Sequence, residues 1–123
     1  MKVPFLDLSL QHRSLREAAL AALADQAWLT QVQARVASGR ERLGTIARAN
    51  GASPLPSATN FVTLDCGRDG DYARAVLAAL TQHGIFVRMP GVAPLDRCIR
   101  VSLGDEQAMA TFGDALGRAL KSI

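Results

Sequence analysis

Two arginines, Arg88 and Arg100, lie in short apolar runs that are typical of strands. Arg88 follows Ile85-Phe86-Val87, and Arg100 lies within Cys98-Ile99-Arg100-Val101. A guanidinium group can hold a carboxylate through two parallel hydrogen bonds, and a strand fixes its direction more rigidly than a loop does. Both arginines are therefore candidates for binding an anionic small molecule, although an arginine in a strand is more often an exposed or edge residue.

Other catalytic and ligand-binding patterns are missing from the sequence. His12 and His83 are far apart, and neither has a second ligand at metal-binding spacing. Cys66 and Cys98 form no CxxC pair and lie in strand-like runs, which predicts two buried, reduced thiols. No GxSxG elbow, GxGxxG turn or GxxxxGK(S/T) loop is present. The sequence thus predicts no metal site, no activated nucleophile and no nucleotide loop.

Length and composition predict one compact domain with a core of two layers, because the chain has 123 residues of which 49% are hydrophobic. The net charge is +3, but the basic residues alternate with acidic ones and form no stripe with stacking aromatics, which argues against nucleic acid. No apolar run approaches a membrane span, and residues 1–11 are too short and too broken for a secretory signal. We expect a cytoplasmic protein without a membrane partner.

A long helical pattern is predicted over residues 14–50, since apolar residues recur there at steps of three and four. Ser14 and Glu17 have the spacing of a capping box, and Asn50-Gly51 supplies a left-handed stop. Candidate breaks inside the run are Asp25, Gly39 and Gly44, so the pattern is compatible with one long helix or with two shorter ones.

The rest of the chain alternates strands and helices. The proline-containing segment 52–57 is predicted to be a connector, and Asp71 is predicted to cap a helix over residues 72–83. Strands are predicted at 60–66, 85–88 and 98–103, with a loop at 89–96 and a last helix that opens at Asp105. The second and third strands should be antiparallel neighbours, because the loop between them is too short for a crossover. This order indicates an α/β fold, an α+β two-layer arrangement with helices on one face of a small sheet.

Three segments, in order and spacing, carry a family resemblance. They are Pro56-Ser57-Ala58-Thr59-Asn60-Phe61-Val62, His83-Gly84-Ile85-Phe86-Val87-Arg88 and Cys98-Ile99-Arg100-Val101-Ser102-Leu103-Gly104. Together they resemble the C-terminal small domain of histidinol-phosphate aminotransferases and their relatives among the fold-type I, class I/II aminotransferases, which depend on pyridoxal phosphate (PLP). The helical residues 23–29 and the arginine-rich helix after them are similar to the family's upstream segment. The opening residues 3–15 more weakly resemble the N-terminus of DegT-type sugar aminotransferases.

The resemblance implies roles for a few residues. Arg100 occupies the position of the arginine that receives the substrate α-carboxylate, and Arg88 that of an arginine near the substrate entrance, where it would hold a phosphate or side-chain group. In such enzymes the large domain carries the PLP-binding lysine, and neither Lys2 nor Lys121 lies in a matching segment. The resemblance thus implies an N-terminal arm (1–13) and a small domain (14–123) without the PLP-binding large domain, with no catalytic residue and no cofactor of its own.

Two hypotheses for function follow from this resemblance. In the first, the chain is the substrate-side part of an aminotransferase, acts on an amino-acid substrate only together with a large domain, and is inactive alone. In the second, it is a stand-alone interaction or regulatory module that forms a homodimer through the former interdomain surface. An ACT-like amino-acid-binding domain is a third reading, and the long leading helix argues against it.

Overall fold

The computed structural model describes residues 9–123, with side chains from Leu15 onward. The described part of the chain forms two compact units, and the division between them falls between Ala34 and Arg35. Of the expected arm, residues 1–8 lie outside the described residues, and they include residues 3–8 of the segment that resembles DegT-type enzymes. None of the described helices is long and apolar enough to cross a membrane.

The predicted helical run forms two helices, and Asp25, one of the three candidate breaks, separates them. Helix α1 spans Ser9–Ala24 and helix α2 spans Gln26–Ala49. The Asp25 carboxylate accepts a hydrogen bond from the backbone N–H of Trp28 at 2.9 Å, as an N-cap does, and so starts the second helix. Because α1 already begins at Ser9, Ser14 lies inside a helix, and the prediction that it caps one is wrong.

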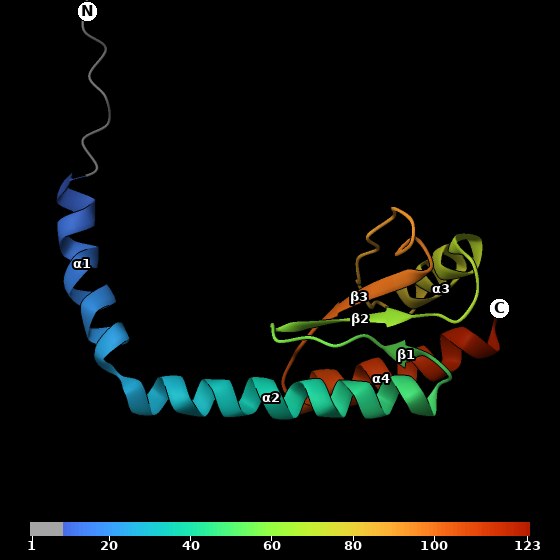
Figure 1. Ribbon diagram of the computed structural model, residues 1–123, viewed down its shortest axis with the longest axis horizontal. Coiled ribbons are helices and arrows are strands. Elements are labelled where there is room, and N and C mark those ends of the chain that lie inside the picture. The colour runs from blue at the N-terminus through green and yellow to red at the C-terminus, as the bar shows by residue number, and fades with distance from the viewer. Residues whose placement is uncertain (1–8) are drawn as a thin grey trace, which may run out of the picture. The chain divides into compact units, whose positions relative to one another are not determined.

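The second unit contains a three-stranded antiparallel sheet in the order β1-β2-β3, with strands Ser53–Pro54, Phe61–Asp65 and Cys98–Ser102 (Figure 1). The strands predicted at 60–66 and 98–103 are confirmed as β2 and β3. The predicted connector at 52–57 was only partly right, because it contains β1. A proline is tolerated there because β1 is an edge strand.

The strand predicted at 85–88 is reduced to one antiparallel bridge between Arg88 and Arg100. The two residues exchange backbone hydrogen bonds of 3.1 and 2.6 Å, which confirms that the segments are antiparallel neighbours. The backbone N–H of Ile85 donates to the carbonyl of Leu80, so the first residue of this segment is bonded to the preceding helix and not to the sheet. A regular strand therefore does not form.

The helices of this unit begin at aspartate caps. Helix α3 spans Gly70–Gln82, and Asp69 caps it by accepting from the N–H of Tyr72 at 2.9 Å. The prediction of Asp71 as the cap was wrong, since Asp71 lies in the first turn. Helix α4 spans Glu106–Lys121 and begins where it was expected, with Asp105 as its N-cap.

The core lies between one face of the sheet and the helices. Alternate residues of β2 and β3 point toward the helices, and buried side chains of α2, α3 and α4 cover them. The larger buried side chains of this core, from strands and helices together, are Leu43, Val62, Leu64, Val76, Leu80, Ile99, Val101, Met109, Phe112 and Leu116. The predicted two-layer fold, with helices on one face of a small sheet, is confirmed. Among residues 35–123, no helix covers the other face, which is called the helix-free face below (Figure 1).

Candidate functional site

The helix-free face of the sheet brings the two candidate arginines together. Arg100 is paired in register with Thr63 of β2 on one side and with Arg88 on the other. Directly opposed residues of antiparallel strands project to the same face. The structure therefore places Arg88, Arg100 and Thr63 in one row across the sheet, called the arginine row below. Val62 and Val101 point to the opposite, core-facing side of the sheet.

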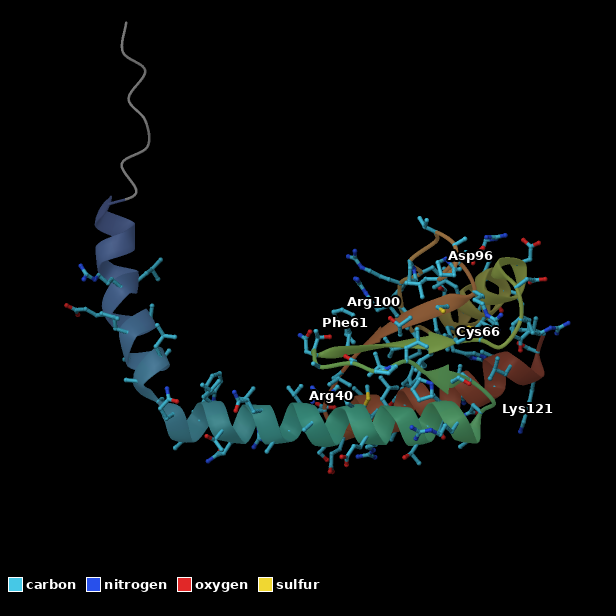
Figure 2. The ribbon with its side chains drawn as sticks, viewed as in Figure 1. Arg40, Phe61, Cys66, Asp96, Arg100 and Lys121 are labelled. Carbon is cyan, nitrogen blue, oxygen red and sulfur yellow. The ribbon has the colours of Figure 1, made fainter. Side chains whose placement is uncertain are left out.

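Arg100 is the best positioned of the three side chains. It is partly buried, and its guanidinium carbon lies 4.8 Å from the centre of the Phe61 ring (Figure 2). Within the described part of the chain its guanidinium forms no ion pair. A guanidinium that lies over a ring makes a cation–π contact and does not use its N–H donors in it. These donors are suited to a carboxylate held by two parallel hydrogen bonds.

Arg88 is more exposed than Arg100, and Phe86, two residues before it, is 83% exposed. Two positive charges directly across a strand pair repel each other. An anion bound between Arg88 and Arg100 would relieve that repulsion, so the pair favours a ligand with one or two negative groups.

A carboxylate on the same sheet, Asp65, is held by Arg97. Its Oδ1 accepts from Nε of Arg97 at 2.8 Å and from the N–H of Gly67 at 2.7 Å. Partial burial alone would raise the pKa of Asp65, but the hydrogen bonds from Gly67 and Arg97 outweigh it, so the pKa is lowered. This ion pair was not predicted from the sequence. The available signal was an acidic residue at the end of one predicted strand, Asp65, and a basic residue directly before another, Arg97.

The two cysteines are free thiols, with Cys98 buried and Cys66 half-buried. Burial, and to a lesser extent the nearby Cys98 and Asp65, raise the pKa of the Cys66 thiol to about 11. Both groups are neutral at physiological pH, which suits packing rather than nucleophilic chemistry. The predicted burial is confirmed for Cys98 and only partly for Cys66.

The described residues do not suit a covalently bound PLP. The lysine among them, Lys121, is exposed in the last turn of α4, at the C-terminal end of the helix layer and away from Arg100 (Figure 2). Asn60 directly precedes β2, and its backbone carbonyl accepts a hydrogen bond from the N–H of Leu103, directly after β3, at 2.9 Å. This bond continues the pairing of the two strands.

Comparison with known proteins identifies the family. Residues 7–116 match the family described as Aminotransferase class I and II. A solved structure, histidinol-phosphate aminotransferase from Sinorhizobium meliloti in complex with pyridoxal-5'-phosphate, is 53% identical with a TM-score of 0.82, over 85% of this chain and 29% of that chain.

Two curated relatives agree with this result. Histidinol-phosphate aminotransferase 2 from Methylococcus capsulatus is 38% identical over 84% of this chain, and that from Gluconobacter oxydans is 34% identical over 85%. The chain spans only 27% and 29% of the length of these two relatives. The family match at residues 7–116 includes strands β2 and β3 and the Arg88 segment paired with β3. The chain belongs to the class I and II aminotransferases.

Proposed function

We propose that the chain is the small, substrate-side domain of a histidinol-phosphate-type aminotransferase and that Arg100 binds the α-carboxylate of the substrate. The observation that carries this proposal is the stacking of Arg100 on Phe61 at 4.8 Å, on the helix-free face of the sheet. The guanidinium is oriented before any ligand arrives, so less side-chain freedom is lost on binding. The similarity to histidinol-phosphate aminotransferases supports the same assignment.

Arg88 is proposed to hold a second group of the same substrate. Its backbone pairing with Arg100 places it one strand spacing away, on the same face. A second negative group, such as a phosphate, or a polar side chain could therefore contact Arg88 while the α-carboxylate contacts Arg100.

The chemistry of transamination is proposed to require residues other than 9–123. When bound, PLP supplies the electron sink for reactions at the amino-acid α-carbon. Because the described residues do not suit this cofactor, we propose that a large domain provides the PLP site and that this chain alone is inactive. Addition of PLP should give no lysine-dependent visible absorbance band, and a band that Lys121→Ala removes would contradict this expectation.

A domain replacement tests the role of Arg100. The matched segment of the Sinorhizobium meliloti enzyme would be replaced by this chain, and transamination of histidinol phosphate would be measured. Arg100→Ala should lower kcat/KM by about a hundredfold to a thousandfold, as expected for loss of a two-bond contact between charged groups.

Arg118→Ala is the matched control, because Arg118 is an exposed arginine in the last turn of α4, outside the arginine row. It should leave kcat/KM unchanged. Equal losses in the two variants, or no loss in Arg100→Ala, would contradict the assignment of the carboxylate to Arg100.

An alternative proposal is a stand-alone cytoplasmic module that forms a homodimer, and the first unit gives the observation that favours self-association. Its helices carry exposed apolar side chains, among them Leu15 at 63%, Leu23 at 71% and Trp28 at 57% exposure. Exposed apolar helix surface of this kind is usually covered by a partner, either a second copy or a large domain. Light scattering at several concentrations should show a dimer that Leu23→Asp dissociates. A monomer at every concentration would contradict this alternative.

A further inference from the structure

A groove of about 370 Å³ lies between α2 and residues 54–57. The wall on the helix side carries Arg40, Glu41 and Arg48, and Val62 also lines the groove. Because Val62 belongs to the core face of β2, the groove lies on the helix side of the sheet. Figure 2 shows Arg40 on α2 and Arg100 across the sheet from it. The groove is therefore separate from the proposed carboxylate site.

Arg48 reaches the groove across Gly44. A Cβ atom at position 44 would stand 3.4 and 3.6 Å from the two terminal nitrogens of Arg48, and 3.6 Å from Cγ of Pro54. Glycine is unfavourable inside a helix. At this position the absence of a side chain lets the Arg48 guanidinium lie close to the helix backbone and to the ring of Pro54, both of which line the groove.

Positive charge is in excess in the groove. Neither Arg40 nor Arg48 forms an ion pair with any residue in the range 15–123, although Glu41 lines the same space. Arg40 donates one hydrogen bond, from Nη1 to the carbonyl of Thr59 at 3.1 Å. That bond fixes the side chain at the wall, and an arginine has further N–H donors to offer. The groove thus has two guanidinium groups and one carboxylate.

We propose that this groove binds a small phosphate monoester, with the phosphate between Arg40 and Arg48. Guanidinium groups match the geometry of phosphate oxygens, and a dianion interacts with both at once. The rest of the ligand would lie on Pro54, Leu55 and Pro56, which form the apolar wall. The volume is in the range of small-molecule sites. Glu41 disfavours a long polyanion, so a single phosphate on a compact apolar body fits best.

The test is a titration of the whole 123-residue chain with phenyl phosphate at constant ionic strength, followed by ¹H–¹⁵N NMR. Saturable shifts are expected at the amides of Gly44 and Ser57 and at the Nε–H groups of Arg40 and Arg48. Arg48→Gln should weaken binding about fivefold to tenfold. Benzoate, which has the same ring and a single charge, should bind more weakly than phenyl phosphate.

Arg118→Gln is the control for the loss of one charge, and it should leave the affinity unchanged. Arg100→Gln should also leave the shifts in the groove unchanged, so failure of the carboxylate proposal would not affect this result. Any of four results would overturn the proposal. These are absence of shifts in the groove, equal weakening by Arg48→Gln and Arg118→Gln, equal affinity for benzoate, or loss of the shifts in Arg100→Gln.

Discussion

Replacing Phe61 with leucine tests whether the ring orients Arg100 for its ligand. Leucine keeps an apolar side chain on β2 but removes the π face that lies 4.8 Å from the guanidinium carbon. A cation–π contact contributes about 0.5–1 kcal/mol when exposed and about 2 kcal/mol when desolvated. Since Arg100 is partly buried, a loss of about 1 kcal/mol is expected, which corresponds to roughly a fivefold weaker carboxylate contact.

Kinetics of the domain-replaced aminotransferase measure this effect. Phe61 would orient Arg100 equally in the substrate complex and in the transition state, so Phe61→Leu should raise KM for the amino acid about fivefold and leave kcat almost unchanged. Phe61→Tyr keeps the π face and should behave like the parent protein. In the chain alone, the Nε–H resonance of Arg100 should lose its ring-current shift in Phe61→Leu.

Two results would refute the reasoning about Phe61. The first is an unchanged KM in Phe61→Leu, which would mean that the ring does not orient the guanidinium. The second is an equal loss in Phe61→Leu and Phe61→Tyr, which would mean that the site responds to any change in packing at β2. A fall in kcat alone would also count against an effect on binding.

Further predictions concern the carboxylate and the thiol beside the site. Asp65→Asn should lower stability at neutral pH by about 0.5–1 kcal/mol, since the ion pair is partly exposed. Because folding lowers the pKa of Asp65 below its ordinary value of 3.8, this stabilisation is present above that pH and is lost as the pH falls through the folded pKa, so thermal unfolding of the variant should change less on acidification. Arg97→Gln should raise KM for the amino acid, because the released Asp65 carboxylate can then pair with Arg100. The Cys66 thiol, with a pKa of about 11 against an ordinary 9.0, should react with iodoacetamide roughly a hundredfold more slowly than an exposed cysteine at pH 8, as followed by mass spectrometry.

The sequence predicted the parts of the fold that depend on local pattern. Strands β2 and β3 are rich in β-branched residues, and α4 has both a cap and a regular apolar stripe, so their positions were recoverable. The cap of α3 could not be predicted in this way. Asp69 and Asp71 are both good cap residues, and the path of the backbone at Gly70 decides between them.

The candidate site was predictable in its residues but not in its contacts. Arg88 and Arg100 stand out by type and position, whereas the stacking of Arg100 on Phe61 depends on the register of β2 against β3. A shift by one residue would send these side chains to opposite faces. The segment before Arg88 was overpredicted as a strand for a related reason, since its first N–H bonds to the end of α3 rather than to the sheet.

The placement of Asp65 explains why Arg100, rather than Arg97, is the arginine suited to a substrate. Asp65 is on the same face of the sheet as Arg100 and two residues along β2 from its partner Thr63, a diagonal distance that a long side chain can span. If this carboxylate paired with Arg100, the site would be neutral before the substrate arrived. The hydrogen bonds from Arg97 and Gly67 hold Asp65 instead, and they favour its ionised form. The Asp65 carboxylate of β2 is thereby paired with Arg97, directly before β3. Arg100, in the middle of β3, keeps its positive charge for an anionic ligand.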